Sequence, residues 1–141
     1  MGHVISYEYL WKSRAGETED GQAAYPAAVI LARDDLGPSP VAYVLGISHS
    51  PPRQDDRAMP VPPKLKRYLG LDDAPSWIYT DQLNVFVWPG PDLRPGEWLS
   101  NRPSAKGTCV ISPLPTDWFA EVRNHLEESY RLKMVRTVRR T

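Results

Sequence analysis

A histidine flanked by hydroxyl side chains stands at the end of an apolar run. The stretch YVLGISHSPP places His49 between Ser48 and Ser50, immediately before two prolines. An imidazole titrates near neutral pH, so it can act as a general base, a general acid or a hydrogen-bond donor to phosphate. The same residue can alternatively cap the end of a strand through hydrogen bonds alone. A catalytic role for His49 therefore depends on partners that other segments bring to it.

A dipeptide, Asp81-Gln82, separates two further apolar runs. Asp81 is expected to orient the imidazole of His49 or to take part in acid–base chemistry, although an aspartate in a turn can also serve only the local backbone. Gln82 is expected to contact the same ligand. The polar loop after His49 carries Arg53 and Arg57, and both are predicted to bring fixed positive charge to a phosphate or an acidic partner.

The composition bounds the class of protein. The chain has 141 residues, with 17 basic and 17 acidic side chains, which fits one domain and does not single out a nucleic-acid binder. Cys109 is the one cysteine, so an internal disulfide and a cysteine-based zinc site are excluded, and no metal or other cofactor is expected. No signal peptide opens the sequence and no apolar run reaches the roughly 18 residues that span a bilayer, so a cytoplasmic protein without membrane association is expected.

Short apolar runs alternate with stretches rich in proline and glycine, a pattern typical of small strands joined by stiff turns. Prolines restrict the run AMPVPP to a short edge strand, and PPKLKRYLGL is expected to form one or two helical turns that stop at Gly70. The polar stretches 11–24 and 51–57 are predicted to be mobile loops that border a binding groove. Other strands are predicted over residues 3–10, 25–33, 41–48, 76–80, 83–88 and 108–114.

After Pro115 the apolar residues change to a helical period. His125 on this helix is expected to be solvated. The basic tail, residues 131–141, is expected to be a solvated helix face, with a nucleic-acid patch as the alternative. Short strands followed by one amphipathic helix predict a single, mainly β domain over residues 1–141, a small SH3-like barrel closed by the helix. The apolar face of the helix is expected to consist of Phe119, Val122, Leu126 and Tyr130.

The order of these segments resembles the MazF/PemK/Kid family of bacterial toxins, which share the CcdB-like fold. The resemblance covers most of the chain, and its most specific part is the Asp-Gln element inside SWIYTDQLNVFVW. It implies the same SH3-like barrel, assembled as a homodimer. The other matching segments are GHV, GETEDGQAAYP, PAAVILA, LGIS and GTCVISPLPTDWFAEVRNHL.

Single positions follow the family pattern or depart from it. The strand-end hydroxyl of the family falls on Ser48, the next position on His49, and the aspartate of Asp-Gln on Asp81. The arginine of the family's Arg-Pro pair falls on Tyr25, and another family arginine, two residues before the aspartate, falls on Tyr79. A tyrosine can donate a hydrogen bond to phosphate but brings no charge, so His49 is expected to supply part of what the arginines would have supplied.

The resemblance implies the toxin component of a type II toxin–antitoxin system, acting as a metal-independent endoribonuclease on single-stranded RNA. RNA and a cognate antitoxin are the implied partners, and His49, Ser48 and Asp81 are the implied catalytic residues. The missing arginines keep an alternative open: a non-catalytic, protein-binding toxin like CcdB, or a degenerate SH3-like interaction module. Substrate contacts are expected from Tyr25, Arg53, Arg57, Tyr79 and Gln82.

Overall fold

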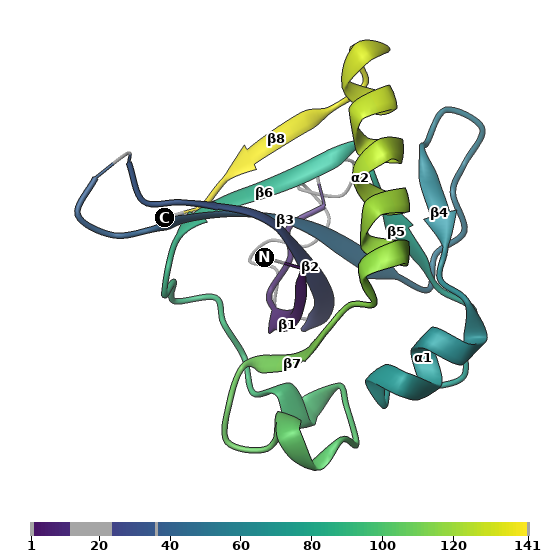
Figure 1. Ribbon diagram of the computed structural model, residues 1–141. Helices are drawn as coiled ribbons and strands as arrows, with labels where there is room; N and C mark the ends of the chain where they lie inside the picture. Colours follow the sequence, from purple (N-terminus) through teal and green to yellow (C-terminus); the bar gives the residue numbers. More distant parts are fainter. Residues whose placement is uncertain (1, 12–23, 36, 141) are drawn as a thin grey trace.

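The computed structural model describes residues 2–11, 24–35 and 37–140. Within this part of the chain, eight strands form one sheet (Figure 1). They are β1 (His3–Tyr7), β2 (Tyr25–Arg33), β3 (Val41–Ser48), β4 (Ala58–Pro60), β5 (Trp77–Tyr79), β6 (Gln82–Val87), β7 (Val110–Pro113) and β8 (Arg136–Arg139). The main path runs β4–β5–β3–β2–β1–β7, and β6 pairs with β3 and β8. All pairings are antiparallel except that of β6 with β8, which is parallel.

The predicted strands are confirmed, with changes at their ends. β1 stops at Tyr7 instead of continuing to Leu10, and Gln82 belongs to β6. β4 contains a proline and lies at one end of the sheet path, as expected for a strand that lacks one ladder donor. Residues 12–23, most of the loop predicted over 11–24, lie outside the described residues.

Two α-helices accompany the sheet: α1 (Pro63–Leu69) and α2 (Thr116–Arg131). Proline at the start of α1 suits a position where the backbone N–H has no helical partner. Gly70 ends α1 in a left-handed conformation with φ of 71°, as predicted from its place after the last apolar residue. The segment 89–107 contains two short 3-10 turns, η2 (Gly96–Trp98) and η3 (Pro103–Ala105).

The basic tail differs from the prediction of a continued helix face. α2 ends at Arg131, and Lys133 adopts a left-handed φ of 59° that turns the chain back toward the sheet. The backbone N–H of Arg136 then donates to the carbonyl of Asp81 at 2.9 Å, and that of Arg140 donates to the carbonyl of Val85 at 2.8 Å. The tail becomes a strand because β6 offers it a complete row of backbone partners.

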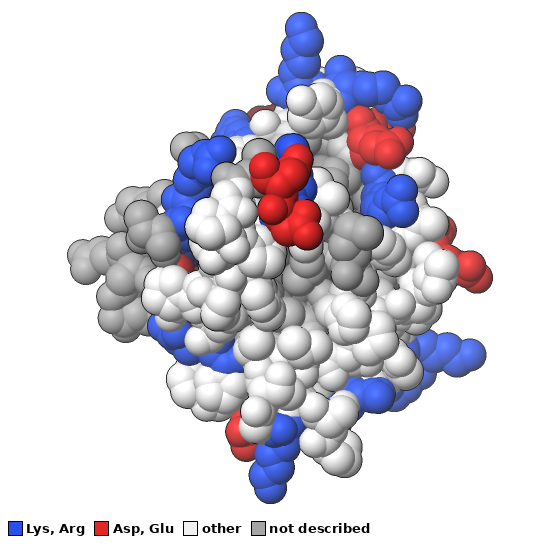
Figure 2. All heavy atoms as spheres, turned by 60° about the vertical axis from the view of Figure 1, so that its left-hand side comes forward, with Lys and Arg blue, Asp and Glu red and all other residues white. Residues whose placement is uncertain are grey.

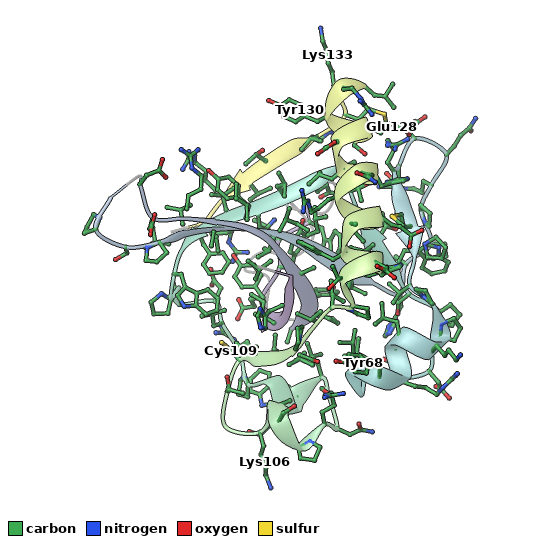
Figure 3. All side chains as sticks on the ribbon, viewed as in Figure 1. Tyr68, Lys106, Cys109, Glu128, Tyr130 and Lys133 are labelled. Carbon is green, nitrogen blue, oxygen red and sulfur yellow. The ribbon has the colours of Figure 1, made fainter. Side chains whose placement is uncertain are left out.

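The buried stripe of α2 is also rotated from the predicted one. Trp118, Val122 and Ser129 are buried, whereas Tyr130 is 74% exposed and projects from α2 in Figure 3. Phe119 and Leu126 are half-buried at the side of this stripe. The polar Ser129 is tolerated on this inner face because it hydrogen bonds with Arg57, just before β4, and with Thr80, just after β5.

The two faces of the sheet carry different cores, because side chains alternate between faces along each strand. One core packs α1 and α2 against aliphatic residues such as Leu45, Ile47 and Ile78. The other is aromatic and includes Tyr7, Tyr9, Trp11, Tyr79 and Phe86. Full burial of one large apolar side chain contributes about 1.5–3 kcal/mol, so both clusters are major sources of stability.

The strand pairings within the described residues do not close the sheet. β4, β7 and β8 each have a single strand partner and therefore lie at edges. The coarse prediction of a mainly β fold with a C-terminal amphipathic helix is confirmed. In the same described ranges, neither helix combines the length and the apolar character needed to cross a lipid bilayer.

Candidate functional site

A small pocket opens beside His49, where the end of β3 meets the turn that follows α1. Its volume is about 140 Å³, well below the roughly 300–1,000 Å³ of pockets that enclose a whole small-molecule ligand. It therefore suits a single small group, such as a phosphate, better than a complete nucleotide. The pocket is lined by Ala24, Tyr25, Pro26, Ile47, Ser48, His49, Lys66, Leu71, Asp72, Ser76 and Leu99.

His49 is held at this pocket by a carboxylate. Its Nε2 lies 2.9 Å from Oδ2 and 3.0 Å from Oδ1 of Asp72. Because a carboxylate only accepts hydrogen bonds, Nε2 carries the ring proton, which leaves Nδ1 as the basic nitrogen of the neutral imidazole. The His49 side chain is 58% exposed, so the ring is open to a substrate. This is the arrangement of a general base and the carboxylate that positions it.

A buried lysine lies behind Asp72. Lys66 is only 4% exposed, and its ammonium donates to Asp72 Oδ1 at 2.6 Å, to Ser76 Oγ at 2.7 Å and to the carbonyl of Ala74. An ammonium has three N–H donors, so all of them are used and the side chain is fixed in place. Lys66 therefore anchors the carboxylate of Asp72, whose negative charge offsets that of the ammonium.

The electrostatics of this group favour an ionised Asp72. Partial burial opposes ionisation of the carboxyl, but the hydrogen bonds from Lys66 and His49 outweigh it and hold the pKa of Asp72 below its usual value. The backbone N–H of Ala74 adds a further hydrogen bond to Oδ1 at 3.2 Å. At neutral pH the pocket thus contains a charged carboxylate that links an imidazole to an ammonium.

Local structure explains why these groups converge. Lys66 lies on the buried side of α1. The left-handed Gly70 reverses the chain after α1, so that Asp72 returns alongside Lys66. Antiparallel pairing of Ser48 with Trp77 brings the end of β3 next to the start of β5. The pocket is therefore built at the junction of two sheet strands and one short helix.

Ser48 and Tyr25 both lie in the pocket, as their predicted roles require. Ser48 is 5% exposed, and its Oγ accepts the backbone N–H of Ser50 at 3.1 Å. The hydroxyl hydrogen of Ser48 remains available for donation to a ligand. Tyr25, at the start of β2, is half-buried and lines the same pocket. The structure thus brings together three of the predicted residues: Ser48, His49 and Tyr25.

Tyr25 and Tyr79, the two positions where the resembling family carries arginine, pack against the same tryptophan. Their rings meet Trp11 edge-on, with centroid distances of 5.5 Å and 5.2 Å. Tyr79 is 4% exposed, and its hydroxyl donates to the carbonyl of Ser50 at 2.5 Å. The predicted substrate contact of Tyr79 is therefore not supported, because its side chain is part of the aromatic core.

Asp81 lies in a different place from His49, contrary to the predicted pairing. Its Oδ2 accepts the backbone N–H of Arg57 at 2.9 Å, and its Oδ1 is buried with no hydrogen-bond partner among the described residues. Burial is the main reason why the pKa of Asp81 is raised. Asp81, Arg53 and Gln82 line a separate hollow of about 480 Å³. The carboxylate that orients His49 is Asp72, which the sequence reasoning missed.

Arg57 is engaged in the fold and is not a free phosphate contact. Its guanidinium donates to Ser129 Oγ at 2.6 Å and to Glu128 Oε1 at 2.7 Å, both on α2. Figure 3 shows Glu128 projecting from α2 on the side of the β4 segment. The Arg57 side chain is 17% exposed. Arg53 is exposed and forms a loose ion pair with Asp56, so neither arginine reaches the pocket of His49.

His125 was expected to be solvated but is half-buried in the network of Arg57. Its Nε2 lies 3.4 Å from Arg57 Nη2, and its Nδ1 lies 2.6 Å from Thr80 Oγ1. Because a guanidinium only donates, Nε2 accepts and the ring proton resides on Nδ1. Desolvation, followed by the charge of Arg57, lowers the pKa of His125. This neutral histidine joins α2 to the end of β5.

Sequence signals for the missed residues exist but are weak. Lys66 stands next to Leu65 and three residues before Leu69, so it falls at the border of the apolar stripe of α1. Asp72 follows the helix-terminating Gly70 and belongs to an Asp-Asp pair, which reads as an ordinary polar turn. The two side chains form an ion pair only because the chain reverses direction at Gly70.

Comparison with known proteins adds no relative to this picture. No protein-family model, curated protein or solved structure matches the chain, so the interpretation of the site stands on its residues and their geometry.

Proposed function

We propose that this protein is the toxin component of a type II toxin–antitoxin system and cleaves single-stranded RNA as a metal-independent endoribonuclease. The observation that carries the proposal is the pairing of His49 with Asp72 beside a phosphate-sized pocket that contains Ser48 and Lys66. Strand cleavage through the ribose 2′-hydroxyl needs a base and a stabilised pentacoordinate phosphate. The pocket offers side chains for both tasks without a metal ion.

In this mechanism Nδ1 of His49 removes the proton of the 2′-hydroxyl while the 2′-oxygen attacks phosphorus. The bond from phosphorus to the 5′-oxygen breaks, and the leaving oxygen takes a proton from solvent at the open mouth of the pocket. The products are a 2′,3′-cyclic phosphate and a free 5′-hydroxyl. Asp72 holds the imidazole in the required tautomer and stabilises its protonated form, so it acts as a positioning residue.

Stabilisation of the phosphate is assigned to three side chains of the pocket. The hydroxyl groups of Ser48 and Tyr25 donate hydrogen bonds to the non-bridging oxygens, and Lys66 contributes its fixed charge at short range. Since the N–H donors of Lys66 are already used, its effect is electrostatic. Because Lys66 is also paired with Asp72, it replaces only part of the charge that an arginine would bring.

The proposal includes four further features that the family resemblance implies: the type of barrel, the homodimer, the cytoplasmic location and the antitoxin. The sheet would be a divergent SH3-like barrel of the MazF and CcdB kind, with β8 as an addition to that pattern. The protein would act in the cytoplasm as a homodimer and would be inhibited by a cognate antitoxin. Arg53 and the basic tail are the exposed cations that suit an acidic antitoxin or RNA outside the pocket.

A protein-binding toxin like CcdB, or an SH3-like interaction module, is the second candidate. The observation in its favour is the packing of Tyr25 and Tyr79 against Trp11. Tyr79 is buried in the aromatic core and Tyr25 packs at its border, and charge-assisted bonds to phosphate from arginine would be about twice as strong as neutral ones. A module of this kind would keep the pocket but would not cleave RNA.

The test is cleavage of a long single-stranded RNA in the presence of EDTA. Wild-type protein should cut, and His49→Ala should be slower by about 10²–10⁴-fold, the usual contribution of a positioned acid–base group. His3→Ala is the matched control, because His3 is exposed on β1 outside this pocket. Equal cleavage by wild type and His49→Ala contradicts the proposal. Growth arrest without any RNA cleavage would favour the protein-binding alternative.

A further inference from the structure

The C-terminal strand presents an unused backbone edge. β8 pairs with β6 alone and has no strand on its other side within the described residues, and Figure 1 shows it as the outermost strand of that part of the sheet. Exposed strand edges are templates for pairing with another chain.

The backbone hydrogen bonds between β8 and the β6 segment fix the orientation of this edge. The N–H groups of Arg136 and Arg140 both donate inward, to Asp81 and Val85 of the neighbouring segment. Backbone groups alternate in direction along an extended strand, with the N–H and C=O of one residue on the same side. The N–H and C=O groups of Thr137 and Arg139 therefore point outward, and together they offer two donors and two acceptors.

The exposed side chains on and just before β8 are mostly basic. Arg136 and Arg139 are exposed and form no ion pair with described residues. Arg131 and Lys133 are exposed just before the strand. Figure 2 shows basic side chains gathered at the top of the molecule, the end from which Lys133 projects in Figure 3. Such charges repel basic chains, and they attract an acidic one.

We propose that the outer edge of β8 binds an extended, acidic segment of another protein, which adds a ninth strand to the sheet. Main-chain hydrogen bonds to Thr137 and Arg139 would provide affinity, and carboxylates near Arg136 and Arg139 would provide specificity. RNA fits this edge less well, because it lacks the regularly alternating backbone N–H and C=O groups that pair with a strand edge. A second copy of β8 is disfavoured, because it would bring the same arginines.

This inference does not rest on RNA cleavage, since the same edge would serve a toxin bound by its antitoxin or a plain interaction module. The experiment uses the full chain and an N-acetylated peptide of alternating glutamate and valine, about eight residues long. The peptide should slow hydrogen–deuterium exchange at the amides of residues 137 and 139 by about tenfold or more. The same peptide N-methylated at alternate residues, which lacks the inter-strand donors, should give no protection.

Matched variants separate the backbone and charge contributions. Thr137→Pro removes an outward donor without touching the inward bonds of β8, and it should weaken peptide binding by about tenfold compared with Thr137→Ala. Arg139→Glu should weaken binding by about tenfold or more, whereas Arg67→Glu, an exposed arginine on α1, should change it less than about twofold.

Several results would overturn the proposal. Equal protection by the N-methylated peptide, by an alternating lysine–valine peptide or by single-stranded oligouridine would show that the edge does not select an acidic strand. The proposal would also be wrong if Thr137→Pro and Arg139→Glu both bound the glutamate–valine peptide as tightly as wild type. Because the N-methylated peptide tests backbone pairing on the ligand, the outcome does not depend on whether Thr137→Pro folds. RNA cleavage by these variants is measured separately, so loss of one function is distinguishable from loss of the other.

Discussion

Nε2 of His49 lies 2.9 Å from Oδ2 of Asp72, and the other oxygen of the same carboxylate lies 2.6 Å from the ammonium of Lys66. One aspartate therefore joins an exposed imidazole to a buried cation. Asp72 is therefore the residue that positions the imidazole of His49.

Asp72→Asn should lower RNA cleavage by roughly 10²–10⁴-fold, because an amide can hold the imidazole in the other tautomer and cannot stabilise its charged form. The measurement compares the cleavage rates of wild type and Asp72→Asn across the pH range in which both proteins are folded. Asp81→Asn is the control and should leave both the rate and the pH profile unchanged. If Asp81→Asn loses activity and Asp72→Asn does not, then Asp81, and not Asp72, positions His49.

Lys66→Met should destabilise the fold by about 1–3 kcal/mol, because it leaves the Ser76 hydroxyl, the Ala74 carbonyl and one oxygen of Asp72 without their shared donor. The measurement is the midpoint of urea unfolding by circular dichroism. Lys64→Met, an exposed lysine on the same helix, serves as the control. If the two variants unfold at the same urea concentration, the buried ammonium contributes no net stability.

Tyr25→Arg should raise RNA cleavage, because the half-buried position 25 borders the pocket and an arginine there would add charge next to a bound phosphate. The variant should lose part of the ring packing against Trp11, so rates are compared at a temperature where both proteins are folded. Tyr79→Arg should instead unfold readily, because residue 79 is buried in the aromatic core. A slower Tyr25→Arg with intact folding would argue that the tyrosine itself serves the site.

The stability of the protein should fall as the pH is lowered from about 7.5 to about 5, because the unfolded chain takes up a proton on His125 that the folded chain resists. The folded pKa of His125 lies below its ordinary value of 6.5, so its stabilising effect is present above 6.5 and is lost as the pH falls toward the folded pKa. The groups that face it are Arg57, Glu128 and Asp81, and the raised pKa of Asp81 acts in the opposite direction.

Thermal unfolding followed across this pH range in wild type and His125→Gln measures the effect. A glutamine can keep a hydrogen bond to Thr80 but has no proton to gain, so the slope of melting temperature against pH above about 5 should become shallower. The His3→Gln variant should retain the wild-type slope. Identical slopes in wild type and His125→Gln would show that another group controls acid stability.

The sequence by itself determined most of the elements. Alternating apolar runs and proline-rich turns located the strands, and the end of α1 at Gly70 was predicted, because these signals act over a few residues. The sequence also placed a chemically capable group, His49 with Ser48, at the end of β3. These local features were confirmed wherever the described residues cover them.

Tertiary structure decided which distant groups meet. Asp81 and Asp72 look alike in the sequence, but strand pairing directs Asp81 toward the backbone of Arg57, and the reversal at Gly70 directs Asp72 toward His49. Likewise, the tail, predicted from its run of basic residues as a solvated helix face, became a strand because it pairs with β6. Hydrogen-bond partners far apart in the chain, such as Arg57 with Ser129 or Tyr79 with Ser50, depend on long-range packing that no short window of sequence contains.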